Sequence, residues 1–189
     1  MNYEDLSLEQ LLKHAHDSAA WYWIGMGYWE QREFEKAKEW LEKTMRNPGN
    51  EWALKSAFNV AQLHSMQGAI KDASIDEAIR LYEKILQIRP KLSLAAIHAG
   101  LLYHSKKHDF VKGRKLVEDG IGFLVEQDGN DDYLAPDECF KIAAMYEVER
   151  ANAKAIEFFK KAINRCEPGY APDDQIAKMA KDAIRELGG

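Results

Sequence analysis

The histidines of this sequence have the clearest potential for chemistry, because two of them, His104 and His108, stand four residues apart. On a helix this spacing places both imidazoles on one face, where they could bind a metal ion together. A zinc site needs a third or fourth ligand, and neither a Cys nor another His stands near this pair. His14 and His16 are similarly isolated. We therefore expect solvated or capping histidines and no metal site.

The acidic segment from Asp128 to Asp132 is the second candidate, because its sequence, DGNDD, is similar to the start of a calcium-binding loop. Such a loop needs a glycine after its third acidic position and a glutamate at its end. Tyr133 and Cys139 stand at these two places. We therefore expect a solvated acidic loop between two helices.

The remaining reactive groups do not form a catalytic pattern. Cys139 and Cys166 lack the CxxC or Cys/His spacing of a zinc site, so we expect two free thiols. Gly25 and Gly27 lie within a helical pattern, whereas the glycines of a dinucleotide-binding loop follow a strand, and no Gly-Lys-Ser or Gly-Lys-Thr occurs. No serine stands in a nucleophile elbow. The sequence thus indicates a protein that is not an enzyme and holds no cofactor.

Composition and charge restrict the partners. The chain has 189 residues, of which 46% are hydrophobic, and a formal net charge of −5, which suits one domain or a short repeat array. A mildly acidic chain is not typical of nucleic-acid-binding proteins. The N-terminus lacks the basic and apolar regions of a secretory signal. The longest uncharged run, Ser18 to Trp29, has 12 residues, fewer than the roughly 20 that span a membrane. We expect a cytoplasmic protein that binds neither nucleic acid nor membrane.

Helical periodicity recurs four times along the chain, each time with a small residue three positions before an aromatic residue or a histidine. These stripes are Trp21-Ile24-Gly25-Tyr28, Ala57-Val60-Ala61-His64, Ala96-Ala99-Gly100-Tyr103 and Cys139-Ile142-Ala143-Tyr146. The second helices that follow them carry Ala37-Leu41-Thr44, Ala78-Tyr82-Ile85, Gly113-Val117-Gly120 and Ala155-Phe159-Ala162. Turns that contain proline end three of the four pairs. The sequence therefore predicts four successive pairs of helices.

This arrangement resembles the tetratricopeptide repeat (TPR), whose signature places Trp, Leu-Gly, Tyr, Ala, Phe, Ala and Pro at fixed spacings. The first and fourth units match it best, while Gly113 replaces the packing alanine of the third. Successive aromatic positions are 36, 39 and 43 residues apart, whereas TPR units are about 34 residues long, so the array is irregular. We expect the turn between His64 and Ala78, which contains Gly68, to be about five residues longer than in the first unit, as in the SEL-type relatives of the TPR.

The resemblance implies an all-α fold, a right-handed α–α superhelix of about four TPR-like helix pairs with a capping helix at each end. The expected segments are an N-terminal capping helix over 7–16, repeats over 18–50, 51–90, 91–127 and 133–168, and a C-terminal capping helix over 172–187. Residues Ser7 to Gln10 have the pattern of a capping box that opens the first helix. Such caps present one polar face and keep a solenoid soluble.

In TPR proteins the residues beside the packing stripe line a concave groove, and here these positions are mainly aromatic and aliphatic. The partner-binding residues that the resemblance implies are Tyr22, Trp23, Met26, Trp29, Phe58, Gln62, Ile97, Leu101 and Phe140. All five tryptophans fall between positions 21 and 52, and Trp23 and Trp29 have no packing role that the repeat requires. The sequence therefore predicts a protein-interaction module, as adaptor, chaperone or regulator, that binds a peptide or helix in this apolar groove.

Other readings of the apolar first helix remain open. It could pack against a second copy, so that the chain is a homodimer instead of a monomer, or the N-terminal helix could cover it as ordinary core. A metal-binding or enzymatic protein is a further alternative. The TPR subclass that grips the carboxylate end of chaperone tails is not indicated, because only Lys55 and Asn59 stand at comparable places. Tyr22 and Met26 occupy the positions where that clamp needs Lys and Asn.

Overall fold

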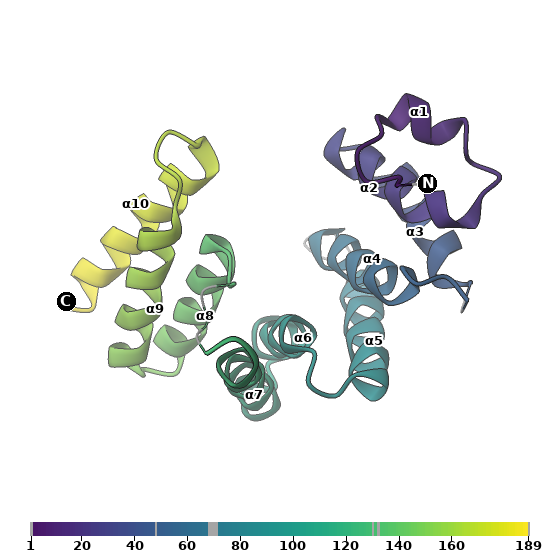
Figure 1. Ribbon diagram of the computed structural model, residues 1–189. Coiled ribbons are helices and arrows are strands. Elements are labelled where there is room, and N and C mark those ends of the chain that lie inside the picture. The colour runs from purple at the N-terminus through teal and green to yellow at the C-terminus, as the bar shows by residue number, and fades with distance from the viewer. Residues whose placement is uncertain (1, 48, 68–71, 130, 132, 189) are drawn as a thin grey trace. The chain divides into compact units, whose positions relative to one another are not determined.

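The structure is a computed structural model that describes residues 2–47, 49–67, 72–129, 131 and 133–188 (Figure 1). Among these residues the regular structure consists of α-helices and one short 3-10 helix, with no β-strand. The all-α prediction is therefore confirmed. The chain divides into two compact units, Met1–Ala95 and Ala96–Gly189, which we describe separately. In the described part of the chain, every helix is too short or too polar to cross a membrane.

The first unit contains a short N-terminal helix and two helix pairs, labelled α1 to α5 in Figure 1. Its elements are α1 (Leu8–Leu12), the 3-10 helix η1 (Ser18–Ala20), α2 (Trp21–Glu30), α3 (Phe34–Met45), α4 (Ala53–Gln67) and α5 (Asp72–Ile88). Helix α2 packs on α3, α3 on α4, and α4 on α5. This sequential packing of neighbouring helices is typical of repeat proteins.

The N-terminal helix is shorter than the expected span of 7–16. The capping box that opens α1 is confirmed, because Ser7 Oγ accepts a hydrogen bond from the Gln10 N–H at 3.4 Å and Gln10 Oε1 accepts one from the Ser7 N–H at 2.9 Å. Helix α1 ends at Leu12, and Asp17 then caps the 3-10 helix that follows, accepting a hydrogen bond from the Ala19 N–H at 2.9 Å.

The second unit contains two helix pairs and a C-terminal helix. Its elements are α6 (Ser93–Lys106), α7 (Phe110–Asp128), α8 (Pro136–Val148), α9 (Asn152–Arg165) and α10 (Ala171–Glu186). Helix α9 packs on α8, and α10 packs on both of them. Pro136 begins α8, where its missing N–H and fixed φ are compatible with a helix N-terminus.

Both helices of the second repeat are longer than those of the first. Three residues, 31–33, separate α2 from α3, and four residues, 68–71, separate α4 from α5. Those four, including Gly68, lie outside the described residues. Helices α4 and α5 have 15 and 17 residues, whereas α2 and α3 have 10 and 12.

The second helix of every pair supplies the most regular part of the core. All of its signature positions are buried: Ala37, Leu41, Thr44, Ala78, Tyr82, Ile85, Gly113, Val117, Gly120, Ala155, Phe159 and Ala162. Removing this apolar surface from water is the main contribution to stability, at about 25 cal/mol for each Å².

Three turns between paired helices carry a residue in the left-handed region that is not glycine. These residues are Arg32, His108 and Arg150, with φ of 60°, 56° and 58°. The next residue then donates its N–H to the carbonyl of the signature tyrosine: Glu33 to Tyr28 at 2.9 Å, Asp109 to Tyr103 at 3.0 Å and Ala151 to Tyr146 at 2.8 Å. The signature tyrosine thus ends each of these three first helices through its main chain.

Replacing Arg32 or Arg150 with glycine should stabilise the protein. A side chain in this region costs about 1–2 kcal/mol, and part of that gain is lost to the greater freedom of glycine in the unfolded chain. We expect each variant to raise the free energy of unfolding by about 0.5–1 kcal/mol in urea denaturation. The control is Lys178→Gly, at an exposed position inside α10, which should lower it by about 1 kcal/mol. A fall in stability for Arg32→Gly and Arg150→Gly would contradict the role assigned to the turns.

Candidate partner-binding surface

The start of α2 is held in place by side chains from two other segments. The Tyr3 hydroxyl donates a hydrogen bond to Asp17 Oδ2 at 2.6 Å, which lowers the pKa of Asp17. Asn50, in the turn between α3 and α4, donates its side-chain N–H to the Ser18 carbonyl at 2.6 Å. Its Oδ1 also accepts a hydrogen bond from the Trp52 N–H at 2.9 Å. Asn50 therefore fixes the N-terminus of α2 and the position of Trp52 together.

Three aromatic rings meet at this point, and we call them the aromatic cluster: Tyr22, Trp23 and Trp52. The Tyr22 and Trp52 rings are stacked, with centroids 5.0 Å apart and an interplanar angle of 12°. Trp23 meets both rings edge-on, at 5.1 Å from each. The ammonium group of Lys55 lies 4.5 Å from the centroid of the Trp52 ring, a cation–π distance. The cluster joins α2 to the beginning of α4.

The other residues that the sequence singled out on α2 and α4 contact side chains of several neighbouring helices. Asn59 of α4 donates a side-chain hydrogen bond to the Met26 sulfur at 3.0 Å. The Trp29 ring meets Phe34 of α3 edge-on at 6.0 Å, and Phe58 meets Tyr82 at 5.5 Å. All these α2 and α4 side chains, and Gln62 with them, are half-buried.

The residues predicted to bind a partner are not equally accessible. Ile97 is 0% exposed and Tyr22 only 8%, so these two predicted residues are buried and present little surface in this structure. Tyr22 is covered by the stacked Trp52, and burial raises the pKa of its hydroxyl. In the second unit, Leu101 and Phe140 are half-buried, and the Phe140 ring meets Phe159 edge-on at 5.3 Å.

The N-terminal segment covers part of α2. Trp23 packs against a buried cluster that includes Tyr3 and Leu11, and so it does have a packing role. Leu8 of α1 lies so close to Gly27 that a Cβ added there would be 3.1 Å from Leu8 Cδ1. Helix α1 therefore lies over the side of α2 that carries Gly27. This agrees with the alternative in which the N-terminal helix covers part of α2. Trp29 is absent from this cluster.

Trp52 is the member of this surface that the sequence patterns missed as a binding residue. It lies just before α4, three residues ahead of Lys55, which stands three residues ahead of the predicted groove residue Phe58. Extending the helical spacing of Phe58 and Gln62 toward the N-terminus would have found it.

The two histidines four residues apart do not converge. His104 is buried, its Nε2 lies 3.3 Å from Glu149 Oε1, and its ring meets Phe110 edge-on at 4.8 Å. His108 lies beyond the end of α6, in the turn with positive φ. Burial lowers the pKa of His104 although Glu149 opposes the shift, which favours the neutral imidazole. Across the residues that the structure describes, no three His, Cys, Asp or Glu side chains gather as metal ligands do.

The acidic segment after α7 contributes to the core of the second unit through Asp131. This carboxylate is 8% exposed and accepts hydrogen bonds from Lys161 at 2.6 Å and Arg165 at 2.8 Å. Although burial opposes its ionisation, these two cations lower its pKa. Arg165 also contacts the buried Cys139 sulfur at 2.8 Å, and burial raises the pKa of that thiol to about 11. The expectation of a solvated loop is therefore wrong for Asp131, while the neighbouring positions 130 and 132 lie outside the described residues.

Comparisons with solved structures identify the fold. The chain is similar to TTC0263, a thermophilic TPR protein in Thermus thermophilus, with a TM-score of 0.63 at 14% identity over 94% of this chain and 87% of that one. BtubC from P. vanneervenii gives a TM-score of 0.60 at 14% identity over 96% and 86% of the two chains. MamA gives 0.57 at 18% identity over 84% of each. No protein-family profile and no curated protein matches the sequence.

The chain therefore has the fold of an all-α helical-repeat protein. Within that class, its repeats are TPR-like, as the spacing of the signature residues implied. Because the identities are 18% or less, the similarity concerns the fold and does not identify a binding partner.

Proposed function

We propose that this protein is a non-catalytic interaction module that binds a peptide or helix of a partner protein through the apolar side chains of α2 and α4. The observation that carries the proposal is the set of half-buried aromatic and sulfur-containing side chains on these two helices of the first unit. We define the binding surface as Trp23, Met26, Trp29, Trp52, Phe58 and Gln62. Leu101 and Phe140 are proposed to contribute in the second unit.

The contacts of these side chains support the proposal. Their rings are held by neighbours, Trp29 by Phe34 and Phe58 by Tyr82, so they lose little conformational entropy when a partner packs on them. Large aromatic side chains in such positions are typical hot spots of protein interfaces. Lys55, which is exposed beside Trp52, offers a charged group at the rim that would orient the partner.

Two residues next to this surface, Tyr22 and Asn59, have a different role in the proposal. Tyr22 lies beneath Trp52, and Asn59 holds the Met26 thioether, so both residues position groups that the partner contacts. Methionine adapts its shape to an irregular apolar partner, whereas the tryptophans provide rigid area. Binding would therefore be driven by burial of the partner's apolar side chains, with no chemical step.

The test compares two tryptophans. Partners are captured from a native lysate on the immobilised chain, identified by mass spectrometry, and titrated as purified proteins. We expect Trp29→Ala to weaken binding at least about tenfold, because truncating a hot-spot residue costs about 2 kcal/mol or more, and Phe58→Glu to abolish it. The matched control is Trp40→Ala, which removes an equally half-buried tryptophan from α3 and should leave binding unchanged.

Circular dichroism of each variant distinguishes loss of the binding surface from loss of the fold. If Trp29→Ala and Phe58→Glu lose their helical content, these residues belong to the core and the proposed surface is wrong. Equal loss of binding in Trp40→Ala would also contradict it. If sedimentation shows a homodimer that Trp29→Ala dissociates, the surface serves self-association and the partner is a second copy.

A further inference from the structure

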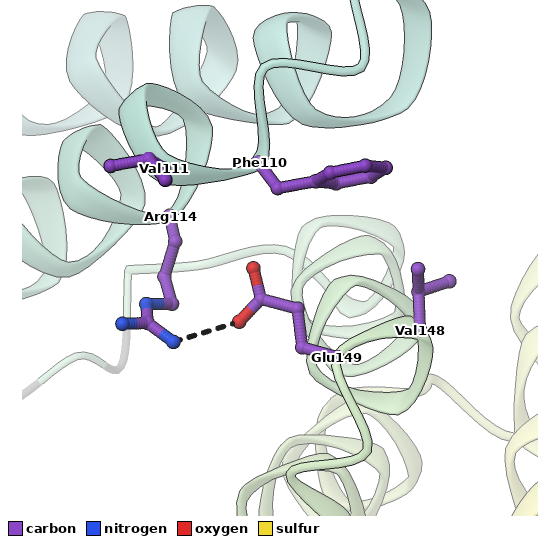
Figure 2. Close-up of a pocket in the computed structure, with 5 residues that line it drawn as sticks. All are labelled: Phe110, Val111, Arg114, Val148 and Glu149. Atoms are coloured by element: carbon purple, nitrogen blue, oxygen red, sulfur yellow. Dashed lines mark hydrogen bonds and ion pairs between the residues drawn. The ribbon is translucent and has the colours of Figure 1, made fainter.

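The second unit contains a pocket on its α6–α7 and α8–α9 turns, which the repeat patterns did not indicate. It has a volume of about 410 Å³ and is lined by Phe110, Val111, Arg114, Val148 and Glu149. Figure 2 shows Phe110, Val111 and Arg114 on α7 and Val148 and Glu149 at the end of α8, with the Arg114 and Glu149 side chains pointing toward each other. Its lining belongs to the second unit, whereas the α2 and α4 surface belongs to the first.

The apolar wall of the pocket is exposed to an unusual degree. Val111 is 83% exposed, Val148 65% and Phe110 44%. Three large apolar side chains gathered at one place and left in contact with water cost free energy, and such patches typically mark interaction sites. Phe110 is held in position by the buried His104 ring, which meets it edge-on at 4.8 Å.

The polar side of the pocket consists of an ion pair between Arg114 and Glu149, in which part of the guanidinium stays exposed. Arg114 Nη1 donates to Glu149 Oε2 at 3.2 Å, as the dashed line in Figure 2 shows. The Glu149 side chain is only 14% exposed, whereas that of Arg114 is 54% exposed. A guanidinium has five N–H donors, and the exposed part of this one can therefore bind an incoming carboxylate as well.

The rim of the pocket is basic although the chain as a whole is acidic. The stretch from Lys106 to Lys115 contains five Lys or Arg residues and one carboxylate, Asp109, in a chain of net charge −5. Asp109 is engaged as the cap of α7, where it accepts a hydrogen bond from the Lys112 N–H at 3.1 Å. The exposed Arg150 adds a further cation beside Glu149.

Two acidic side chains of α7 near the rim are paired within the chain. Asp119 pairs with Lys115 at 2.5 Å, and Glu118 pairs with Lys154 at 2.9 Å. Lys106, Lys107 and Lys112 are exposed around the α6–α7 turn. With these pairs set aside, the exposed charges of the α6–α7 turn are mainly basic, which favours an acidic ligand.

We propose that this pocket docks an apolar side chain presented by an acidic segment of a partner protein. The apolar side chain packs against Phe110, Val111 and Val148, and the flanking carboxylates meet Arg114 and the exposed lysines. A second copy of this chain is a poor occupant, because a symmetric contact would bring the same basic rim against itself. The inference is independent of the surface proposed on α2 and α4, and either can fail without the other.

The experiment uses the full chain and fluorescein-labelled synthetic peptides, followed by fluorescence anisotropy. The probe has two central leucines flanked by Asp and Glu. One matched peptide replaces the leucines with alanine, and another replaces the acids with lysine. We expect the acidic leucine peptide to bind most tightly and to bind less tightly as salt rises, because about 0.1 M salt screens charges beyond about 10 Å.

A pair of variants on one helix tests the site. Val111→Glu places a carboxylate on the exposed apolar wall and should weaken binding of the acidic leucine peptide at least about tenfold. Val125→Glu changes another exposed valine of α7, outside the pocket lining, and should bind as the wild type does. Because both valines are exposed, both variants should keep the wild-type circular dichroism spectrum.

Several results would overturn the proposal. It fails if Val111→Glu binds the peptide as well as Val125→Glu, or if the alanine or lysine peptide binds as tightly as the acidic leucine peptide. Absence of binding up to about 1 mM peptide, the limit of a weak specific contact, also overturns it. A wild-type dimer in sedimentation that Val111→Glu dissociates would make a second copy the occupant.

Discussion

Gly113→Ala, a change toward the residue that the other three repeats carry, should lower the free energy of unfolding by about 2 kcal/mol. Alanine normally stabilises a helix relative to glycine by about 0.5–1 kcal/mol. Here that gain is outweighed because α6 and α7 touch through their main chains. A Cβ at Gly113 would lie 2.7 Å from both the N and the Cβ of His104, and 2.8 Å from the Gly100 carbonyl oxygen.

The main chain cannot move aside as the end of a flexible side chain can. Relief of the clash requires α7 to move away from α6, which opens the buried packing around Val117. In a protein of this size a loss of about 2 kcal/mol corresponds to a Tm lower by about 4–8 °C. Thermal unfolding followed by circular dichroism measures this shift.

The control lies on the same helix. A Cβ at Gly122 meets no atom within 4 Å, so Gly122→Ala should raise the free energy of unfolding by about 0.5–1 kcal/mol. If Gly113→Ala stabilises the protein as much as Gly122→Ala does, the close contact between α6 and α7 does not exist in solution.

Asp131→Asn should destabilise the second unit by about 2–3 kcal/mol. The change removes a buried charge that holds Lys161 and Arg165, and it leaves the Arg165 guanidinium, whose side chain is 16% exposed, without its carboxylate. The cost is less than the roughly 3–5 kcal/mol of a fully buried pair, because the Lys161 side chain is 30% exposed and can turn toward water. Urea denaturation at neutral pH measures it.

The pH dependence of the free energy of unfolding shows whether the charge of Asp131, and not only its shape, stabilises the protein. Because the folded-state pKa of Asp131 is below its ordinary value of 3.8, its contribution is present above that value and is lost as the pH falls through the folded-state pKa. The difference in stability between wild type and Asp131→Asn should therefore narrow in acid. The matched control, Asp137→Asn, removes an exposed carboxylate paired with Lys141 at 2.8 Å and should cost less than about 0.5 kcal/mol. Equal costs for the two variants would contradict the assignment.

The fold was predictable because its determinants are local and repeated. The spacing of Ala37, Leu41 and Thr44, and of their counterparts in the other pairs, follows the period of a helix with one buried face. All of these positions are buried in the structure, and the capping box at Ser7 also forms as its pattern predicts. Each signal lies within a few residues, so one sequence suffices to find it.

The candidate surface was predictable only in part. Periodicity indicates the face of a helix on which a residue lies, but it does not indicate which neighbouring segment covers that face. Trp23 has no packing role that the repeat requires, yet it packs against a buried cluster that includes Tyr3 and Leu11. Ile97 was expected to line a groove, yet it is fully buried. Trp52 joins the surface through a stacked contact with Tyr22, which lies thirty residues earlier in the chain.

The amino-acid sequence by itself determined the helix pairs, their order and most of their buried residues, because these depend on short-range periodicity, caps and turns. Only the tertiary structure decided which polar and aromatic groups became partners. It placed Asp131 between Lys161 and Arg165, and it made Gly113 a contact between two main chains. It also gathered Phe110, Val148 and Glu149 around one pocket. These contacts join residues from different helices, and their distances depend on how the helices pack against one another, which no local pattern in the chain encodes.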